Sequence, residues 1–115
     1  MGKHLNKVTG NYGEQLAVRY LKKQKYEIIE QNFITKLGEI DIIAKENDTL
    51  VFIEVKTRKT AEFGLPREAV TKYKQNKIRQ VATDYLKQNK SLNSLCRCDV
   101  IDILDDNITH IKNAF

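Results

Sequence analysis

The chain has 115 residues, a formal net charge of +5, and hydrophobic and charged fractions of 41% and 30%. These values suit one globular domain with a modest core and exclude a disordered chain. No apolar run approaches the roughly 20 residues of a membrane span, and the N-terminus lacks the apolar segment of a secretory signal. Two cysteines without such a signal indicate a reducing compartment. We therefore expect a single cytoplasmic domain over residues 1–115, with no membrane partner.

The N-terminal part predicts a tail, a helix and a strand. We expect residues 1–10 to form a flexible tail. Residues 11–25 place apolar side chains at helical spacing and end in basic residues, which predicts a helix. Residues 26–33 suit a strand that leads into a bend near residues 35–38.

The next two strands form a predicted hairpin over residues 38–44 and 50–57. Asn47 and Asp48 between them are residues that favour turns. A turn centred on these two residues fixes the register of the hairpin, and it places Ile43 opposite Phe52.

Four charged side chains interrupt this apolar hairpin. Strand alternation puts Glu39, Asp41, Glu54 and Lys56 on one face, whereas the other face is wholly apolar and must pack on a core. In the predicted register Asp41 faces Glu54, and Glu39 faces Lys56. Two carboxylates at about 4.5–5.5 Å destabilise a sheet unless they share a proton or bind a cation. The alternative is a solvated face of an antiparallel sheet, and the spacing alone leaves both interpretations open.

The longest predicted helix follows a loop over residues 57–65. Pro66 suits the first turn of a helix, which we expect to continue to Gln88. The residues predicted for its inner side are Val70, Tyr73, Ile78, Val81, Ala82, Tyr85 and Leu86.

The C-terminal part predicts one strand and a second at the edge of the sheet. Residues 98–104 form a strand that would pair in parallel through a right-handed crossover. Residues 105–107 form a turn, and residues 108–115 return as an edge strand. The expected fold is therefore α/β: a small central mixed β-sheet flanked by helices, in the order α-β-β-β-α-β with this additional edge strand.

The basic residues concentrate in one segment of the chain. Residues 56–79 contain eight basic and two acidic side chains, so this segment carries +6 and the rest of the chain −1. A concentrated positive charge suits a phosphate-backbone partner. A solvated helix face is the alternative explanation.

The cysteine and histidine side chains form no recognisable zinc or catalytic pattern. Cys96, Cys98 and His110 fall short of a four-ligand zinc site. Neither His4 nor His110 has a recognisable nucleophile as a partner, so the pattern gives no support to serine-type or cysteine-type hydrolysis.

The hairpin charges resemble the motif of the PD-(D/E)xK nuclease superfamily, with Asp41 as the first acid and Glu54, Val55 and Lys56 as the (D/E)xK element. More narrowly, the chain resembles the bacterial UPF0102 or YraN-like family. The segments that carry this resemblance are GEQLAVRYL, GEIDIIA, VFIEVKTR, LPREAVTKYKQNKI and HIKNAF. The resemblance implies a restriction-endonuclease-like fold, similar to that of archaeal Holliday-junction resolvases. The chain departs from the family at Cys98, where an aromatic residue is usual.

The resemblance also implies the roles of individual residues. Asp41, Glu54 and the carbonyl of Val55 would bind Mg²⁺ or Mn²⁺, and Lys56 would be the catalytic lysine. Glu14 resembles a helix-borne acid that approaches the metal. The nucleic-acid-binding residues would be Arg58, Lys59, Lys72, Lys74, Gln75 and Lys77, of which Gln75 and Lys77 would reach the site or the phosphates.

The function expected from these features is that of a metal-dependent endodeoxyribonuclease acting on branched or junction DNA as a homodimer. The main alternative is a non-catalytic nucleic-acid-binding or scaffold module that retains the nuclease fold. A protein-interaction domain without a nucleic-acid role is a third hypothesis.

Overall fold

The computed structural model describes residues 2–59 and 70–115, with side chains from Tyr12 onward. Its elements are α1 (Gly2–Lys23), β1 (Glu27–Thr35), β2 (Gly38–Glu46), β3 (Thr49–Arg58), α2 (Lys72–Gln88), β4 (Leu95–Leu104) and β5 (Asn107–Ile111). The five strands form one sheet in the order β1-β2-β3-β4-β5. Strands β3 and β4 are parallel, whereas the other neighbours are antiparallel. The predicted mixed sheet, its parallel pair and its final edge strand are confirmed.

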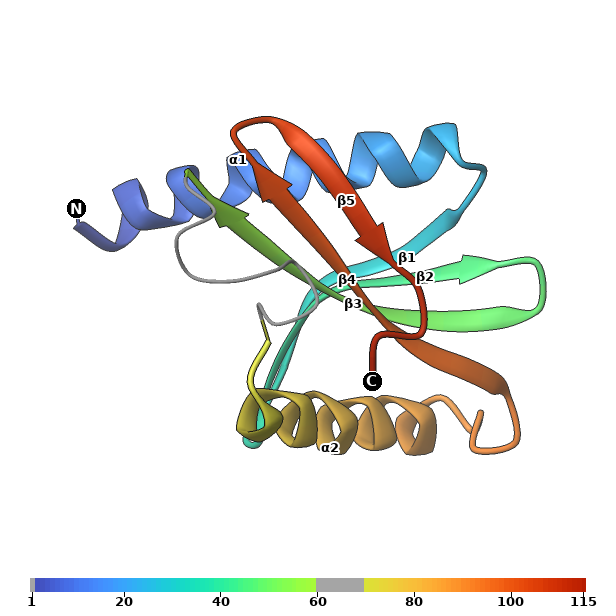
Figure 1. Ribbon diagram of the computed structural model, residues 1–115. Helices are drawn as coiled ribbons and strands as arrows, with labels where there is room; N and C mark the ends of the chain where they lie inside the picture. The colour runs from blue at the N-terminus through green and yellow to red at the C-terminus, as the bar shows by residue number, and fades with distance from the viewer. Residues whose placement is uncertain (1, 60–69) are drawn as a thin grey trace.

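The two helices cover opposite faces of the sheet (Figure 1). Under α1, a buried cluster joins Ala17 and Leu21 to Ile42, Ile53 and neighbouring strand residues. Under α2, a second cluster is built from Phe33, Ile40, Ile43, Leu50, Phe52, Val70, Ile78, Val81, Ala82, Tyr85, Leu86, Cys98 and Val100. Ile43 and Phe52 share the predicted charged face of the hairpin, so that face is not simply solvated: its half next to the turn is buried by α2.

The first helix begins much earlier than predicted. It starts at Gly2, so the segment expected as a flexible tail is helical from that residue onward. Residues 2–10 contain no proline to interrupt a helix, although their apolar side chains show no strong helical periodicity. No helix in the described part of the chain is long and apolar enough to cross a membrane.

The second helix is capped by Thr71, whose Oγ1 accepts a hydrogen bond from the Lys74 amide at 3.2 Å. The predicted start at Pro66 lies outside the described residues. Tyr73 was placed wrongly on the inner side, since 71% of it is exposed. It precedes the buried Ile78 by five residues, which at 3.6 residues per turn is about 140° around the helix axis.

The turns agree with the turn-favouring residues. Strand β2 ends at Glu46 and β3 begins at Thr49, with Asn47 in a left-handed conformation at φ 53°. Ile43 pairs with Phe52, which confirms the predicted register. The last turn is shorter than predicted, because the positive φ angles of Asp105 and Asp106, 49° and 72°, allow a two-residue hairpin.

Candidate active site

Strands β2 and β3 stop pairing and diverge at Asp41 and Glu54, the two carboxylates that were predicted to face each other. Their ladder runs from the turn only as far as the pair Ile42 and Ile53. Beyond it, Oδ2 of Asp41 accepts a hydrogen bond from the Val55 amide at 2.8 Å. The Asp41 side chain thus takes a backbone donor of β3 where the ladder has ended. The first part of β2 remains paired with β1, and Figure 1 shows this hairpin end curving toward α2.

Glu54 lies at this parting and is almost fully buried, with 6% exposed. Burial and the negative charge of Asp41 raise the pKa of Glu54 to about 8, outweighing the opposing effects of Lys74 and Lys56. Nζ of Lys74 lies 3.8 Å from Oε2 of Glu54. The structure therefore brings Asp41 and Glu54 close enough to interact strongly, although they do not form a regular ladder pair.

Helix α1 adds Glu14 to the same group. The helix backbone lies so close to β3 at Gly13 that a Cβ atom there would collide with Oγ1 of Thr57. Glu14 follows directly and is half-buried. Burial and then the charge of Asp41 raise the pKa of Glu14, whereas a hydrogen bond with Asn32 lowers it. The predicted helix-borne acid thus lies within electrostatic reach of Asp41.

Glu39 is a further acid of this group. Its pKa is raised by burial, then by the charge of Asp41 and a hydrogen bond with that residue, and Lys74 opposes the shift. Between these described residues there is no ion pair of Glu39 with Lys56, so the predicted pairing is wrong. The reason is that the ladder ends before it reaches that position.

The polar residues of α2 are divided between the site and the surface. Lys74 reaches Glu54, and its side chain is 45% exposed. Gln75 instead donates from Nε2 to the Val70 carbonyl at 3.1 Å. Nζ of Lys77 lies 5.6 Å from the centroid of the Tyr73 ring. Lys74, rather than Gln75 or Lys77, is the residue of this helix that contacts the carboxylates.

The remaining predicted nucleic-acid-binding residues differ in solvent exposure. Nε of Arg58 lies 2.9 Å from Oδ1 of the buried Asp102, and this guanidinium is only 15% exposed. Lys59, Lys72 and the predicted catalytic Lys56 are exposed. Arg58 therefore joins β3 to β4, whereas the three lysines have exposed side chains.

The donor atoms at the parting fit a hard divalent cation only in part. Within the described residues no three His, Cys, Asp or Glu side chains are arranged to hold a metal ion. However, Mg²⁺ commonly takes only one or two protein carboxylates and completes its shell with water and phosphate oxygens. Asp41 and Glu54 supply two, and a bound cation would offset both the burial of Glu54 and its repulsion by Asp41, which together raise the pKa of Glu54.

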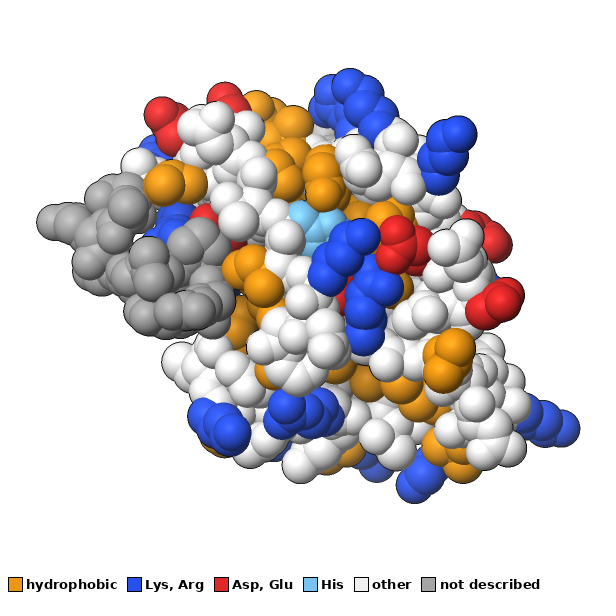
Figure 2. Space-filling model, turned by 45° about the vertical axis from the view of Figure 1, so that its right-hand side comes forward, with side chains coloured by type: hydrophobic (Ala, Val, Ile, Leu, Met, Phe, Trp, Pro, Cys, Tyr) orange, Lys and Arg blue, Asp and Glu red, His pale blue; other side chains and the backbone are white. Residues whose placement is uncertain are grey.

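A second buried carboxylate, Asp99 on β4, has an unexpected set of partners. Its oxygens accept hydrogen bonds from Arg97 at 3.0 and 3.2 Å and from the Asn113 amide at 2.9 Å. Nε2 of His110 lies 2.7 Å from Oδ2 of Asp99, and Nδ1 lies 3.0 Å from the Tyr20 hydroxyl. In Figure 2, basic and acidic side chains gather around a histidine in the middle of one face.

His110 lies on strand β5, as predicted, and its partners are Asp99 and Tyr20. Both of its ring nitrogens are engaged, and together with Tyr20 it links α1 to β4 and β5. Sequence reasoning missed this group because its members are up to 90 residues apart. Arg97 and Asp99 alternate along one strand, which was the only local signal.

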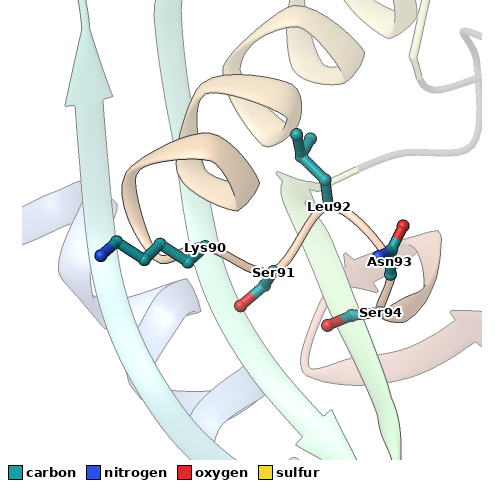
Figure 3. A pocket seen from close by; sticks show the side chains of 5 residues that line it. All are labelled: Lys90, Ser91, Leu92, Asn93 and Ser94. Atoms are coloured by element: carbon teal, nitrogen blue, oxygen red, sulfur yellow. The ribbon is translucent and has the colours of Figure 1, made fainter.

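A hollow of about 400 Å³ lies at the connection between α2 and β4. Figure 3 shows the side chains that line it, which are Lys90, Ser91, Leu92, Asn93 and Ser94. None of the clustered carboxylates lines this hollow, so the hollow forms no part of the candidate site.

The comparisons with known proteins agree on one family. The family model described as "Uncharacterised protein family UPF0102" matches residues 13–103. A UPF0102 protein of Geotalea daltonii is 49% identical, covering 99% of this chain and 94% of the relative. One from Caldicellulosiruptor saccharolyticus is 48% identical, covering 92% and 95%, and one from Clostridioides difficile is 46% identical, covering 96% and 98%. The match spans Glu14, Asp41, Glu54 and Lys56, and the chain belongs to the UPF0102 family.

Proposed function

We propose that this protein is a metal-dependent nuclease that cleaves phosphodiester bonds in DNA. The observation that carries the proposal is the parting of β2 and β3 at Asp41 and Glu54. There a buried Glu54 has a like charge as its neighbour and a single lysine at 3.8 Å. Burying a charge without full compensation costs several kcal/mol, so such a group needs a compensating role. Binding a cation is a role that fits these donors.

Different residues would bind the metal and stabilise the phosphate in such a site. Asp41, Glu54 and the Val55 carbonyl would hold Mg²⁺ or Mn²⁺, which when bound supplies a water of lowered pKa and neutralises phosphate charge. Lys56 is exposed next to these groups and would stabilise the negative charge of the phosphate or orient the water. Glu14 would approach the same position from α1.

The charge distribution supports a nucleic-acid substrate. The segment of residues 56–79 carries +6, and its lysines at positions 56, 59 and 72 are exposed, the first two shortly after Glu54 in sequence. Such a surface binds phosphates with an affinity that falls as salt rises. Branched DNA as the substrate and a symmetric homodimer follow from the resemblance to resolvases, because a two-fold junction requires two equivalent sites.

The experiment that tests the proposal is a cleavage assay with Mg²⁺ or Mn²⁺ on single-stranded, duplex and branched DNA. We expect wild-type protein to cut at least one substrate and Lys56→Ala to lose roughly 100-fold or more in rate. Lys36→Ala, which changes an exposed lysine on the turn between β1 and β2, is the matched control. The proposal is wrong if wild-type protein leaves every substrate uncut under conditions where it binds them.

A non-catalytic nucleic-acid-binding module is the second candidate. It is favoured by the finding that, within the described residues, no three acidic, histidine or cysteine side chains are arranged for a metal. Calorimetry with Mn²⁺ on wild type and Glu54→Ala separates the two functions. Binding that is lost in the variant supports the nuclease, whereas binding to neither protein supports the module.

A further inference from the structure

Tyr73, in the first turn of α2, is an aromatic side chain that the fold leaves in solvent. Among the described large apolar and aromatic side chains it has the highest exposed fraction, 71%. Tyr12 of α1 is also exposed, but its hydroxyl group donates a hydrogen bond at 3.4 Å to the carboxylate of Asp106. Neither of the two buried clusters contains Tyr73. Its ring is therefore accessible to a ligand.

The surroundings of this ring are positively charged. The neighbours of Tyr73 in the chain are Lys72, which is exposed, and Lys74, whose side chain is 45% exposed. One helical turn further, Nζ of Lys77 lies 5.6 Å from the centroid of the Tyr73 ring. The first turn of this helix contains no acidic residue. Proteins that bind single-stranded nucleic acids combine such features, because cations attract the phosphates while an aromatic ring stacks on a base.

The ring is also close to the candidate active site. Lys74 places its ammonium group 3.8 Å from Oε2 of Glu54. Tyr73 directly precedes Lys74, and consecutive Cα atoms are about 3.8 Å apart. Successive side chains of a helix point about 100° apart, so Lys74 reaches the carboxylates while Tyr73 faces solvent beside it. A base that stacked on Tyr73 would therefore belong to a nucleotide near the phosphate that is cleaved.

Stacking on a side chain requires a base with a free face. Inside duplex DNA the faces of each base are covered by the neighbouring base pairs, and extruding a base costs a few kcal/mol (about this range). Single strands and the unpaired points of branched DNA offer such faces without this cost. The exposed ring thus suits unpaired DNA better than a continuous duplex.

We propose that Tyr73 is a stacking residue that binds an unpaired DNA base next to the candidate active site. This inference rests on the proposed function and narrows the substrate class to DNA with unpaired nucleotides beside the point of cleavage. Lys72 and Lys77 would bind the phosphates on either side of the stacked base. Because every base has a π-face, no preference for one base is expected.

The first measurement is DNA affinity in EDTA, where metal-dependent cleavage cannot occur. Tyr73→Ala is expected to lower the affinity for single-stranded oligothymidylate by roughly 10-fold, whereas Tyr73→Phe retains the ring and the wild-type affinity. Tyr12→Ala removes the other exposed tyrosine and is the matched control, which should leave the affinity unchanged. Thermal melting shows whether each variant remains folded.

An abasic oligonucleotide of the same length separates stacking from phosphate binding. Its affinity should be equal for wild type and Tyr73→Ala, because it has no base to stack. The inference is overturned if Tyr73→Ala binds oligothymidylate as tightly as wild type, or if it loses the same factor on both oligonucleotides.

Salt dependence gives a second separation. Lys72→Ala removes a cation and should reduce the slope of log Kd against log salt by roughly 0.7, the value for one phosphate contact on a single strand. Tyr73→Ala should keep the wild-type slope. A reduction as large as that of Lys72→Ala would show that Tyr73 acts only through the neighbouring lysines, against the inference.

The most direct measurement uses fluorescence. The protein contains no tryptophan, so Tyr73→Trp introduces a single reporter at the position of the ring. Oligothymidylate should quench its emission and the abasic oligonucleotide should not. Leu92→Trp, an exposed position beyond the other end of α2, is the control and should respond to neither. Equal responses of Tyr73→Trp to the two oligonucleotides would contradict stacking.

These measurements fail independently of the proposed function. If Tyr73→Trp is quenched as expected but wild-type protein cuts no DNA with Mn²⁺, only the proposed function is wrong. If wild-type protein cuts DNA while Tyr73→Ala keeps full affinity for oligothymidylate, only the inference about Tyr73 is wrong.

Discussion

Glu54 and Asp99 are two buried carboxylates on neighbouring strands with opposite electrostatic surroundings. Glu54 pairs with Val100, the residue after Asp99, in the parallel ladder of β3 and β4. Asp99 is fully buried, yet its pKa is lowered, because its hydrogen bonds with His110, Arg97 and the Asn113 amide outweigh the effect of burial. The pKa of Glu54 is raised, because burial and the charge of Asp41 outweigh the opposing effects of Lys74 and Lys56.

This difference shows that the fold stabilises the ionised form of one buried acid and disfavours that of the other. The partners of Asp99 are all supplied by the chain, so its charge is satisfied in the folded protein and fastens β4 to β5. The partners of Glu54 do not compensate its burial and the charge of Asp41, so its pKa is raised to about 8 and the ionised form is disfavoured in the folded protein. Burial alone would not have distinguished these two acids.

The largest expected effect is on stability when Asp99 is changed. Asp99→Asn removes a fully partnered buried charge and leaves Arg97 with only Glu46 as an acidic partner. We expect a loss of about 3–5 kcal/mol in the free energy of unfolding, measured by urea denaturation. Asp84→Asn, on the outer part of α2, is the control and should change stability little.

If Asp99→Asn does not fold, a milder variant keeps the prediction testable. His110→Asn removes one partner of Asp99 and the contact with Tyr20. It should cost roughly 1–3 kcal/mol. A loss below about 1 kcal/mol in Asp99→Asn would contradict the structural role of this acid.

The second prediction is a gain in stability rather than a loss. Glu54→Gln removes an undercompensated charge, so the metal-free variant should be more stable than wild type at pH 8, on the order of 1 kcal/mol. The folded pKa of Glu54 is raised from 4.5 to about 8, so the folded state holds a proton that the unfolded state releases. The contribution of Glu54 to the stability of the wild type therefore decreases as the pH rises from 4.5 to about 8. This decrease should be absent in Glu54→Gln.

Urea denaturation in EDTA at several pH values measures this difference. Glu27→Gln changes an exposed acid at the start of β1 and serves as the control. The contribution of Asp99 should behave oppositely, since its pKa is lowered from 3.8. That contribution is present above pH 3.8 and is lost as the pH falls through the lower folded pKa. If the free energy of unfolding depended on pH in the same way in wild type and Glu54→Gln, the raised pKa of Glu54 would be contradicted.

The smallest expected effect distinguishes two lysines of α2. Lys74→Met removes the cation next to Glu54, whereas Lys77→Met removes only a contact with the exposed Tyr73 ring. Because Lys74 is partly exposed, we expect a loss of roughly 0.2–1 kcal/mol in stability at pH 8. The loss should disappear in a Glu54→Gln background. Equal losses for the two lysines, in both backgrounds, would show that Lys74 does not act through Glu54.

Much of the hairpin could be predicted because its information is local. The turn residues Asn47 and Asp48 and the alternation of side chains fixed a register that the structure confirms. The same reasoning failed one rung further, at Asp41 and Glu54, because it assumed that the strands stay paired. Strand divergence depends on how β1 and β2 pack against α2, which no pattern within the hairpin encodes.

The sequence by itself determined the order of the elements and the register of the hairpin as far as Ile42 and Ile53, because these depend on short-range periodicity and turn chemistry. The tertiary structure alone decided which side chains complete each group: Lys74 at Glu54, and His110 at Asp99. These partners come from separate elements, and their contacts depend on how the two helices lie on the sheet. The same packing supplies every partner of Asp99 and leaves Glu54 with few.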